Sequence, residues 1–387
     1  MSTGTVQQIM NQTPERLNAC YTPGNFIDTY APGHYARVME AEDVRTGRMV
    51  AFKVMRPEHL SDDGTPRWEA RAFVSEADLL VRLAGCEAVV RLYDCGYVSS
   101  RAERPDGGEI VSFGLDIAAF REALYPAAAQ QWRPYLALEL LPRHHNLFYL
   151  MKPNAGNGRR RLPTEEGIDL ALQFAEFLQQ AHSQRIVYLD HKLEHVYWDG
   201  EKLRIIDLNS SQLIEVGTHT LDQHLARDIH NLCVGILYPI FTGLSPKKGA
   251  LRPQPASQAE VEQRYADVDH LDFGVEPTLS PALQALLQQG ARQELSTIEA
   301  FRAGLERIAG RHGWEFPGLH TIPALREARQ RVRAGLAELR RSQQALRTAR
   351  ELLLEAVILD DINEDMEAEL RRILAQINDA LNHRVIP

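Results

Sequence analysis

The segment VYLDHKLEHVYWDG, residues 187–200, places an acid, a base and two histidines within six residues. Asp190 could orient a hydroxyl group, and Lys192 could neutralise the charge of a phosphate. Phosphoryl transfer needs these two groups together with a carboxylate that holds a metal ion. The segment thus raises the question whether it belongs to a phosphate-transfer site with one part exchanged, or to a former site that no longer works.

The residues before this segment predict a sheet. From about residue 24 to 112 the pattern is short and alternating, as in ARVMEAEDV and GRMVAFKVM, and TG at 46–47 predicts a hairpin turn between these runs. A helix is expected at about 67–84, because apolar residues recur there at three- and four-residue spacing. These residues are Phe73, Ala77, Leu80 and Leu83. The first hundred residues are thus expected to form mainly an antiparallel sheet with one helix against it.

A helical region is expected after a strand at 135–142. Residues 165–183 have the pattern of an amphipathic helix, and the nearly all-apolar run 226–243 predicts a buried helix. Between the strand and these helices, residues 151–163 are rich in Gly, Pro and Arg. Such a composition indicates a loop or a flexible insertion.

A separate pattern begins near residue 324. Large apolar residues repeat every seven positions, and a small residue follows each of them by three positions. The large residues are Leu325, Val332, Leu339, Leu346 and Leu353. After the polar run 360–365, a second stripe consists of Met366, Leu370, Ile373, Ile377 and Leu381. The two stripes predict an antiparallel helical hairpin that closes on itself, or that pairs with another chain or with the helical region.

The composition is typical of a soluble globular protein, expected in the cytoplasm. The chain has 387 residues, of which 44% are hydrophobic, enough for two domains. No apolar run reaches the roughly 18 residues of a membrane span, and the first twenty residues do not have the pattern of a signal peptide. A net charge of −9 argues against nucleic acid as a partner. The four cysteines lack zinc-site spacing and are expected to be reduced, buried thiols.

Taken together, these segments resemble the protein kinase fold over roughly residues 26–310. The segment YAPGHYARVMEAEDVRTGRMVAFK matches the glycine-rich loop and the two following strands of that family in register. The resemblance assigns Gly33 to the middle glycine of the loop and Lys53 to the lysine that grips the phosphates of ATP. It also implies that Val38 and Ala51 line the nucleotide-binding surface.

Two further anchors follow in the order of the family. In FVSEADLLVRLAGCEAVVRLYDCGY, Glu76 takes the place of the glutamate that pairs with Lys53. A lysine inside a cleft needs such a carboxylate, which holds its position and keeps it charged. In YLALELLP, the resemblance assigns Leu138 to the gatekeeper and Glu139 to Leu141 to the hinge, whose backbone groups would bind adenine.

The opening segment then resembles the catalytic loop of the family. The resemblance assigns Asp190 to the catalytic aspartate, Lys192 to the lysine that neutralises the transferring phosphate, and Asp207 to the aspartate that binds magnesium. His195 stands where the family has a metal-binding asparagine, and the bacterial lipopolysaccharide-core kinases also have histidine there. Imidazole suits manganese or zinc better than magnesium. His195 is therefore a metal ligand that favours manganese, or a packing residue of an inactive fold.

Other positions depart from the family. Ala31 and Ala36 stand in place of the outer glycines of the loop and should weaken nucleotide binding, because their methyl groups lie where the backbone must approach the phosphates. Tyr188 and Leu189 replace His-Arg, so control by a phosphorylated activation loop is not expected. The stretch 207–228 is short and has no A-P-E motif, so the usual platform for peptide docking is curtailed or absent.

The expected fold is α+β: a bilobal, protein-kinase-like fold with an antiparallel sheet and one helix in its N-lobe, a helical C-lobe, and a C-terminal helical hairpin. The expected boundaries are an N-terminal extension at 1–25, the N-lobe and hinge at 26–142, the C-lobe at 143–320 and the hairpin or coiled coil at 324–387.

The resemblance implies an ATP-dependent phosphotransferase, most simply a divergent serine/threonine protein kinase that uses ATP with Mg²⁺ or Mn²⁺. Two alternatives stay open. One is a pseudokinase that senses nucleotide or serves as a scaffold through the hairpin 324–387. The other is a kinase that acts on a sugar or another small molecule. The expected partners are ATP, a protein or small-molecule acceptor, and a protein partner or second copy bound through 324–387.

Overall fold

The structure is a computed structural model that describes residues 13–28, 35–151, 160–215, 221–246, 258–314, 316, 323–357 and 363–382. The chain divides into two compact units, residues 1–314 and 315–387. The architecture is mixed α+β with a curled antiparallel sheet, so this part of the sequence prediction is confirmed. Among the described residues, no helix is both long and apolar enough to cross a membrane.

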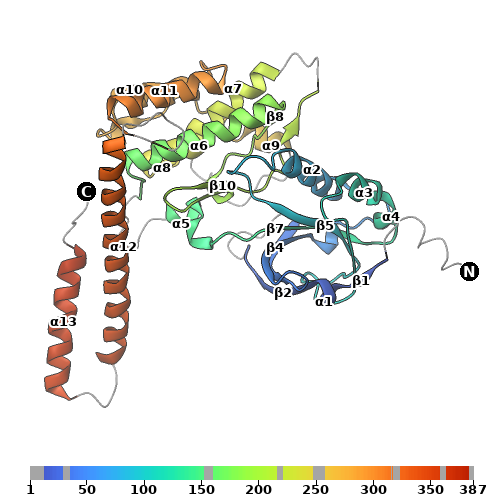
Figure 1. The fold of residues 1–387 in the computed structure, drawn as a ribbon, viewed down its shortest axis with the longest axis horizontal. Helices are drawn as coiled ribbons and strands as arrows, with labels where there is room; N and C mark the ends of the chain where they lie inside the picture. Colours follow the sequence, from blue (N-terminus) through green and yellow to red (C-terminus); the bar gives the residue numbers. More distant parts are fainter. Residues whose placement is uncertain are drawn as a thin grey trace, which may run out of the picture. The chain divides into compact units, whose positions relative to one another are not determined.

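Seven strands of the described chain form one sheet, and every neighbouring pair is antiparallel (Figure 1). In spatial order they are β1 (Glu15–Arg16), β6 (Glu109–Ser112), β5 (Leu92–Val98), β7 (Arg133–Glu139), β4 (Arg48–Met55), β3 (Ala36–Asp43) and β2 (Tyr21–Phe26). β1 and most of β2 lie in the segment that was expected to be an N-terminal extension. They join the sheet because Leu17, Cys20 and Tyr21 are buried in its core.

The predicted hairpin between β3 and β4 is confirmed. The two strands pair from Ala36 opposite Met55 to Asp43 opposite Arg48. Gly47 closes the turn with a φ of +67°, a conformation that glycine adopts without steric cost. This register, continued onto β7, fixes which side chains share a face with Lys53.

Aromatic rings fill one side of the sheet. Phe52 stacks on Tyr135 with ring centroids 4.8 Å apart, and Tyr21 lies 5.1 Å from Phe52. The buried carboxylate of Asp94 accepts hydrogen bonds from the hydroxyls of Tyr21 at 2.8 Å and Tyr135 at 2.7 Å. The polar ends of these rings are therefore satisfied inside the core, which fixes the layer under β4.

The helix predicted at 67–84 is α2 (Trp68–Arg82), and it packs on β5 and β7. Three further short helices accompany the sheet, where only one helix was predicted. They are α1 (Leu17–Cys20), α3 (Ile117–Glu122) and α4 (Leu124–Ala129), and α3 packs on both α2 and β5. The side chain of Glu76 on α2 is fully buried beneath this layer, although glutamate normally stays at the surface.

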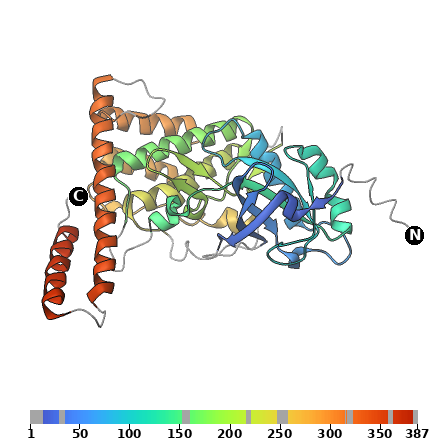
Figure 2. The same cartoon turned by 60° about the horizontal axis from the view of Figure 1, so that its bottom comes forward.

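The rest of residues 143–314 is mainly helical (Figures 1 and 2). Its helices are α5 (Leu147–Leu150), α6 (Thr164–Ser183), α7 (Leu221–Asn231), α8 (Tyr238–Thr242), α9 (Gln258–Gln263), α10 (Pro281–Ala291) and α11 (Ile298–Arg311). α6 confirms the helix predicted at 165–183, and it packs on α11. Single 3₁₀ turns of this region lie at Arg143–His145, Leu193–His195 and Phe273–Val275, and a further one, Pro57–His59, follows β4.

The predicted buried helix at 226–243 is interrupted. α7 runs into a π-helical segment, Leu232–Leu237, which continues directly as α8. All residues from 228 to 242 are buried, as the apolar run predicted. A π-helical turn widens a helix locally and is often found at functional sites.

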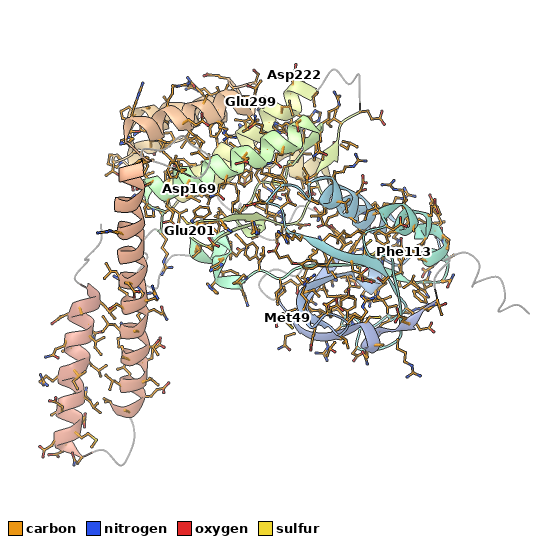
Figure 3. The ribbon with its side chains drawn as sticks, in the orientation of Figure 1. Met49, Phe113, Asp169, Glu201, Asp222 and Glu299 are labelled. Carbon is orange, nitrogen blue, oxygen red and sulfur yellow. The ribbon has the colours of Figure 1, made fainter. Side chains whose placement is uncertain are left out.

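The segment 187–200 includes parts of two short antiparallel strand pairs. β8 (Ile186–Val187) pairs with β11 (Gln212–Leu213), and β9 (Val196–Trp198) pairs with β10 (Leu203–Ile205). Gln173 of α6 fixes the turn between β9 and β10, because its amide donates to the carbonyl of Glu201 at 2.7 Å and to Asp169 at 3.0 Å. Figure 3 labels Asp169 and Glu201 on the two neighbouring segments. The turn is thus tied to the longest helix of this unit.

The second unit is the predicted helical hairpin. α12 (Pro323–Val357) and α13 (Glu364–Asn382) pack against each other (Figure 1). The stripe predicted on α13 is partly wrong: Met366 is 53% exposed, whereas Leu374 is 7% exposed. Leu370, Leu374, Ile377 and Leu381 have alternating spacings of four and three, and this spacing keeps all four on the side that faces α12.

Candidate active site

Lys53 and Glu76 form the buried centre of the site. Lys53 on β4 donates to both carboxylate oxygens of Glu76 on α2, with Nζ 2.8 Å from Oε2 and 3.0 Å from Oε1. The side chains of Lys53 and Glu76 are 7% and 1% exposed. The pairing predicted from the sequence is therefore present in the structure.

Asp207 is distant from Lys53 and Glu76 in the sequence, but it also contacts Lys53. Lys53 Nζ lies 2.8 Å from Oδ1 of Asp207, which follows β10 and whose side chain is 25% exposed. Asp207 has a φ of +63°, in the left-handed region that non-glycine residues rarely enter. This backbone conformation is one of the features that direct its carboxylate toward Lys53.

Lys53 is shared by the carboxylates of Glu76 and Asp207, and the pKa values of these two carboxylates shift in opposite directions. Burial opposes the charge of Lys53, but Asp207 and Glu76 outweigh burial and hold the pKa of the ammonium well above its usual value. Burial also opposes the charge of Asp207, but Lys53 and the contacts with His195 outweigh it and hold the pKa of Asp207 well below its usual value. Burial raises the pKa of Glu76 to about 7, because the charge of Lys53 is partly offset by Asp207. Glu76 is thus the carboxylate that changes its charge near neutral pH.

His195 connects Asp207 to Asp190. It closes the 3₁₀ turn Leu193–His195, and its Nε2 lies 3.1 Å from Oδ2 of Asp207 while its Nδ1 lies 3.6 Å from Oδ2 of Asp190. Imidazole and carboxylate are both metal ligands, so Nε2 of His195 and Oδ2 of Asp207 form a facing pair of donors. Within the described ranges, no group of three or more His, Cys, Asp and Glu residues could hold a metal ion alone. A bound cation would need further ligands from a substrate or from water.

Asp190 is surrounded by cationic groups. Its Oδ2 lies 3.1 Å from Nζ of Lys192, and its Oδ1 lies 2.8 Å from a guanidinium nitrogen of Arg264. Burial alone would raise the pKa of Asp190, but Lys192, His195 and Arg264 outweigh it and hold that pKa below the usual value. Asp190 is therefore a buried carboxylate that is kept ionised.

A buried aspartate on α7 fixes the backbone in front of Asp190. The carboxylate of Asp228 accepts hydrogen bonds from the backbone N–H groups of Tyr188 and Leu189, both at 2.8 Å. Nε2 of His182 lies 3.0 Å from the same carboxylate, and Asn231 donates to the carbonyl of Leu189 at 2.9 Å. Leu189 has a φ of +65°, so these contacts hold a strained residue in place.

The π-helical segment packs against the loop that contains Asp190 and His191. A side chain at Gly235 would place its Cβ 2.7 Å from the carbonyl oxygen of His191 and 2.7 Å from the ring of Tyr265. Tyr265 in turn donates from its hydroxyl to that carbonyl at 3.1 Å. Glycine at 235 therefore allows the segment that bears Arg264 and Tyr265 to pack closely under the Asp190 loop.

The other predicted site residues line the sheet next to Lys53. Val38 lies opposite Lys53 on β3, and Ala51 lies opposite Leu138 on β7. Because Ala51 and Lys53 are two positions apart on β4, all four side chains share one face. Ala51 and Leu138 are buried, and Val38 is half-buried. Together they form an apolar surface beside the ammonium of Lys53.

The predicted hinge follows β7. The backbone N–H of Glu139 donates to the carbonyl of Arg91 at 2.8 Å, and its carboxylate lies 3.6 Å from Nε of Arg204. Leu141 is half-buried and lies two residues beyond the end of the strand. Gly33, the predicted loop glycine, lies outside the described residues.

The sequence analysis missed several residues of the site. Arg264 and His182 contact it from segments with no motif of their own. Tyr35 is also part of it: its ring centroid lies 5.7 Å from Nζ of Lys53, and its ring packs edge-on against Phe73 and Trp68. Its place just before β3 gives no sequence signal for this role.

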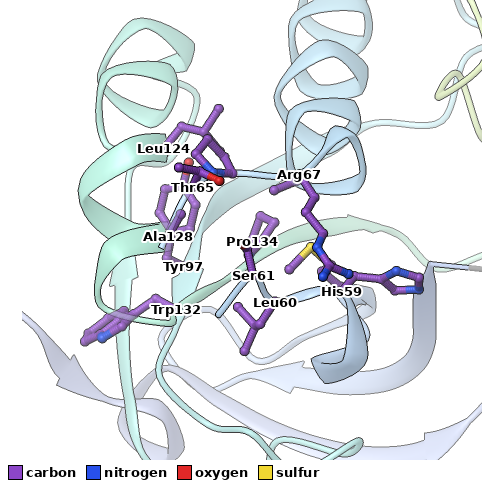
Figure 4. A pocket seen from close by; sticks show the side chains of 13 residues that line it. His59, Leu60, Ser61, Thr65, Arg67, Tyr97, Leu124, Ala128, Trp132 and Pro134 are labelled. Carbon is purple, nitrogen blue, oxygen red and sulfur yellow. The ribbon is translucent and has the colours of Figure 1, made fainter. Parts of the chain in front are cut away.

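A small separate cavity lies beside the start of α2 (Figure 4). Its wall includes His59, Leu60, Tyr97, Leu124 and Trp132, and its volume of about 10 Å³ is room for about one water molecule. It shares no lining residue with the group around Lys53 and Asp190. It is therefore distinct from the candidate site and too small for a cofactor.

No protein-family model matches this chain, and no curated protein matches it.

Proposed function

We propose that this chain is an ATP-dependent phosphotransferase with a protein-kinase-like fold, which transfers the γ-phosphoryl group of ATP to a hydroxyl acceptor. The observation that carries the proposal is a continuous chain of close polar contacts from Glu76 through Lys53, Asp207 and His195 to Asp190, with successive distances between 2.8 and 3.6 Å. Lys192 joins it at 3.1 Å from Asp190. The sequence resemblance assigned all of these residues to one site, although they come from distant segments.

Each residue of this chain has a role in the proposed reaction. Lys53, held by Glu76, would bind the phosphates of ATP. Asp190 would orient the acceptor hydroxyl and take its proton as the acceptor oxygen bonds to the γ-phosphorus and the bridging oxygen leaves with ADP. Lys192 would stabilise the negative charge on the transferring group. A divalent cation, held by Asp207 and His195, would neutralise charge on the phosphate oxygens.

The apolar surface next to Lys53 fits the remaining part of the nucleotide. Val38, Ala51 and Leu138 offer nonpolar side chains on one face of the sheet, where an adenine ring could be buried. The polar groups that would select adenine are backbone groups after Leu138, between Glu139 and Leu141. Adenosine would thus lie along the sheet with its phosphates toward Lys53.

A second candidate function is a pseudokinase that senses nucleotide without transferring phosphate. The observation in its favour is that the charged groups of the site already neutralise one another. Asp207 contacts both Lys53 and His195, and Asp190 contacts both Lys192 and Arg264. Nucleotide binding would have to break or rearrange the first set of contacts, and acceptor binding the second.

Phosphate transfer from labelled ATP separates the two functions. The full chain is incubated with γ-labelled ATP and Mn²⁺ or Mg²⁺, with and without a generic hydroxyl-bearing protein, and nucleotide binding is measured in parallel by calorimetry. The variants are Asp190→Ala and Asp207→Ala, and the matched control is Asp78→Ala, whose carboxylate pairs with Arg82 on the exposed side of α2.

The outcomes are distinct. Transfer by the native chain and by Asp78→Ala, with loss of at least 100-fold in the other two variants, supports the phosphotransferase, since proton transfer and phosphate stabilisation each contribute on the order of 10²-fold or more. Nucleotide binding without transfer supports the sensor. A chain that neither binds nor transfers, with both metals tested, would sink both functions.

A further inference from the structure

The a and d positions at which α12 and α13 meet, here called the seam, are only partly buried. On α12, Leu346, Ala349, Leu353 and Ala356 of the predicted heptad pattern are all half-buried, and among the side chains of α13 that the structure describes only Leu374 and Ile377 are buried. Two helices alone cannot enclose the residues between them, because each seam residue still meets solvent at its edges. Whether a further layer covers the hairpin depends on what its flanks carry.

One flank of the hairpin carries an additional apolar stripe. In the heptads of α12, Leu352 occupies the g position next to the seam residue Leu353, and it is 61% exposed. In the heptads of α13, whose seam contains Leu374, Met366 and Ile373 occupy the g position, and Met366 is 53% exposed. In an antiparallel pair of helices the two g positions flank the same side of the seam. Leu352, Met366 and Ile373 therefore form one stripe, which we call the g flank.

Over residues 339–357 of α12, which match the length of α13, the opposite flank is mostly polar. Its e positions hold Gln343, Arg350 and Val357 on α12 and Glu364, Arg371 and Asn378 on α13, so Val357 is the one apolar residue among them. Leu336, an earlier e position of α12, lies outside this stretch. A hairpin that needs only its own two helices requires apolar residues at a and d alone, whereas helices that face the core of a larger bundle have a wider stripe, with e or g apolar as well. The asymmetry of this hairpin thus corresponds to a bundle with one more helical layer on the g flank.

The charges of the two helices indicate what that layer is. α12 has eight arginines and four glutamates, a net charge of +4, whereas α13 has five acidic residues and two arginines, a net charge of −3. Within a four-helix bundle of two hairpins related by a two-fold axis, each basic helix can lie between two acidic helices. A second copy of this chain supplies that alternation without any other partner.

We propose that the chain is a homodimer in which the g flanks of two hairpins pack against each other to form an antiparallel four-helix bundle. The same patch serves both copies, as two-fold symmetry requires. The bundle would bury Leu352, Met366 and Ile373 together with the open edges of both seams, and it would leave the polar e flanks in water. This proposal is independent of the enzymatic function.

The experiment is a measurement of solution mass by light scattering during size exclusion, on the full chain from micromolar concentration upward. The expected mass of the native chain is about 87 kDa, twice the 43.7 kDa of one copy. The variant Leu352→Glu/Met366→Glu should elute at the mass of one copy, because it places four glutamates in the shared core. Leu354→Glu is the matched control: Leu354 is also an exposed leucine of α12, at 50%, but it lies away from the g flank and should leave the dimer intact.

Two further readouts keep the result decisive. Circular dichroism checks that the double variant retains its helices, which is expected because both substituted side chains are largely exposed within one copy. Co-purification of tagged and untagged native chains tests self-association independently, and the single variant Met366→Glu should weaken it. A native chain that stays at 43.7 kDa overturns the dimer. A dimer that survives in the double variant, or is lost in Leu354→Glu, overturns this interface.

Discussion

Nζ of Lys53 lies 2.8 Å from Oδ1 of Asp207, although 154 positions of the chain separate the two residues. This contact links β4 of the sheet to the segment after β10 in the helical part. Because the same ammonium also holds Glu76 on α2, one cation determines the relative placement of three elements. A change in the charge of Lys53, Glu76 or Asp207 should therefore change the pKa values of the other two residues.

The pH dependence of ATP use should reveal Glu76. Burial raises the pKa of its carboxyl to about 7, so at pH 6 it is mostly protonated and no longer pairs with Lys53 as an anion. If the proposed function holds, kcat/KM for ATP should rise between about pH 6 and 8 with a midpoint near 7. In Glu76→Gln this rise should be absent, and in the exposed-site control Glu58→Gln it should be retained.

The same group affects stability with the opposite sign. The pKa of Glu76 is higher in the folded state than its ordinary value of 4.5, so folding disfavours the ionised form. The free energy of unfolding should therefore fall as pH rises from about 4.5 to 7 for the native chain, relative to Glu76→Gln, as measured by urea denaturation. A difference between the two proteins that does not change across this window would contradict the assignment.

Replacement of His195 by asparagine should change the metal preference. Imidazole is a good ligand for manganese, whereas magnesium prefers oxygen, so activity with Mn²⁺ should exceed activity with Mg²⁺ in the native chain. His195→Asn should reverse this order by about tenfold, equivalent to about 1.4 kcal/mol of differential metal binding. The paramagnetic resonance of bound Mn²⁺ in the presence of an ATP analogue gives a readout besides activity. The same Mn²⁺-to-Mg²⁺ ratio in both proteins would show that His195 is not a ligand.

Removal of one oxygen from Asp228 should destabilise the fold. Its two carboxylate oxygens accept from two backbone N–H groups, of Tyr188 and Leu189, and an asparagine there would point an amide N–H₂ at one of these donors. Asp228→Asn should lower the free energy of unfolding by about 3 kcal/mol, the cost of a broken buried charge network. Asp78→Asn, at an exposed helix pair, should change it by less than about 1 kcal/mol.

The effect of Asp228→Asn should depend on pH. Burial opposes ionisation of Asp228, but its hydrogen bond with His182 outweighs burial, so the pKa of the carboxyl lies below its usual value. The stability it contributes is therefore present above about pH 4 and is lost as pH falls through the lower folded pKa. The native chain and the variant should converge in stability under acid. A gap that is constant with pH would contradict a charged Asp228.

Two helical glycines should respond in opposite ways to alanine. Gly235→Ala places a methyl group 2.7 Å from the carbonyl of His191, so the loop below Asp190 must shift, and overpacking of this kind costs about 1–3 kcal/mol. Gly310 on α11 has nothing within 4 Å of its Cβ position, and Gly310→Ala should stabilise the chain by about 0.5–1 kcal/mol. Thermal unfolding of both variants tests the contrast. Equal effects would mean that the packing under the loop is loose.

Local patterns predicted most of the elements. Alternation and the TG turn predicted β3 and β4, and helical periodicity predicted α2 and α6 within a few residues. The sequence resemblance also named Lys53, Glu76 and Asp207, which contact one another in the structure, and Asp190, which is linked to Asp207 through His195. These features could be found because each depends on neighbours in sequence or on the order of motifs.

Other features depend on tertiary contacts and left no local signal. From Leu232 onward, the run 226–243 is apolar on nearly all sides, so it has no periodicity from which the π-helical segment could be inferred. Arg264 contacts Asp190 from a segment far away in the sequence, whose Tyr265 packs closely against Gly235. The short strand β1 was missed because its two residues, both exposed, are too few for any alternation to be visible.

Leu189 and Asp207, with φ of +65° and +63°, place the two ends of the site in a backbone region that leucine avoids and that aspartate enters only occasionally. A peptide covering residues 186–207 would therefore relax to another conformation if it were cut out of the chain. The arrangement of Asp190, His195 and Asp207 is thus a property of the assembled fold and not of the local sequence. It would disappear in any partly unfolded state in which α7 separates from this loop, well before the secondary structure is lost.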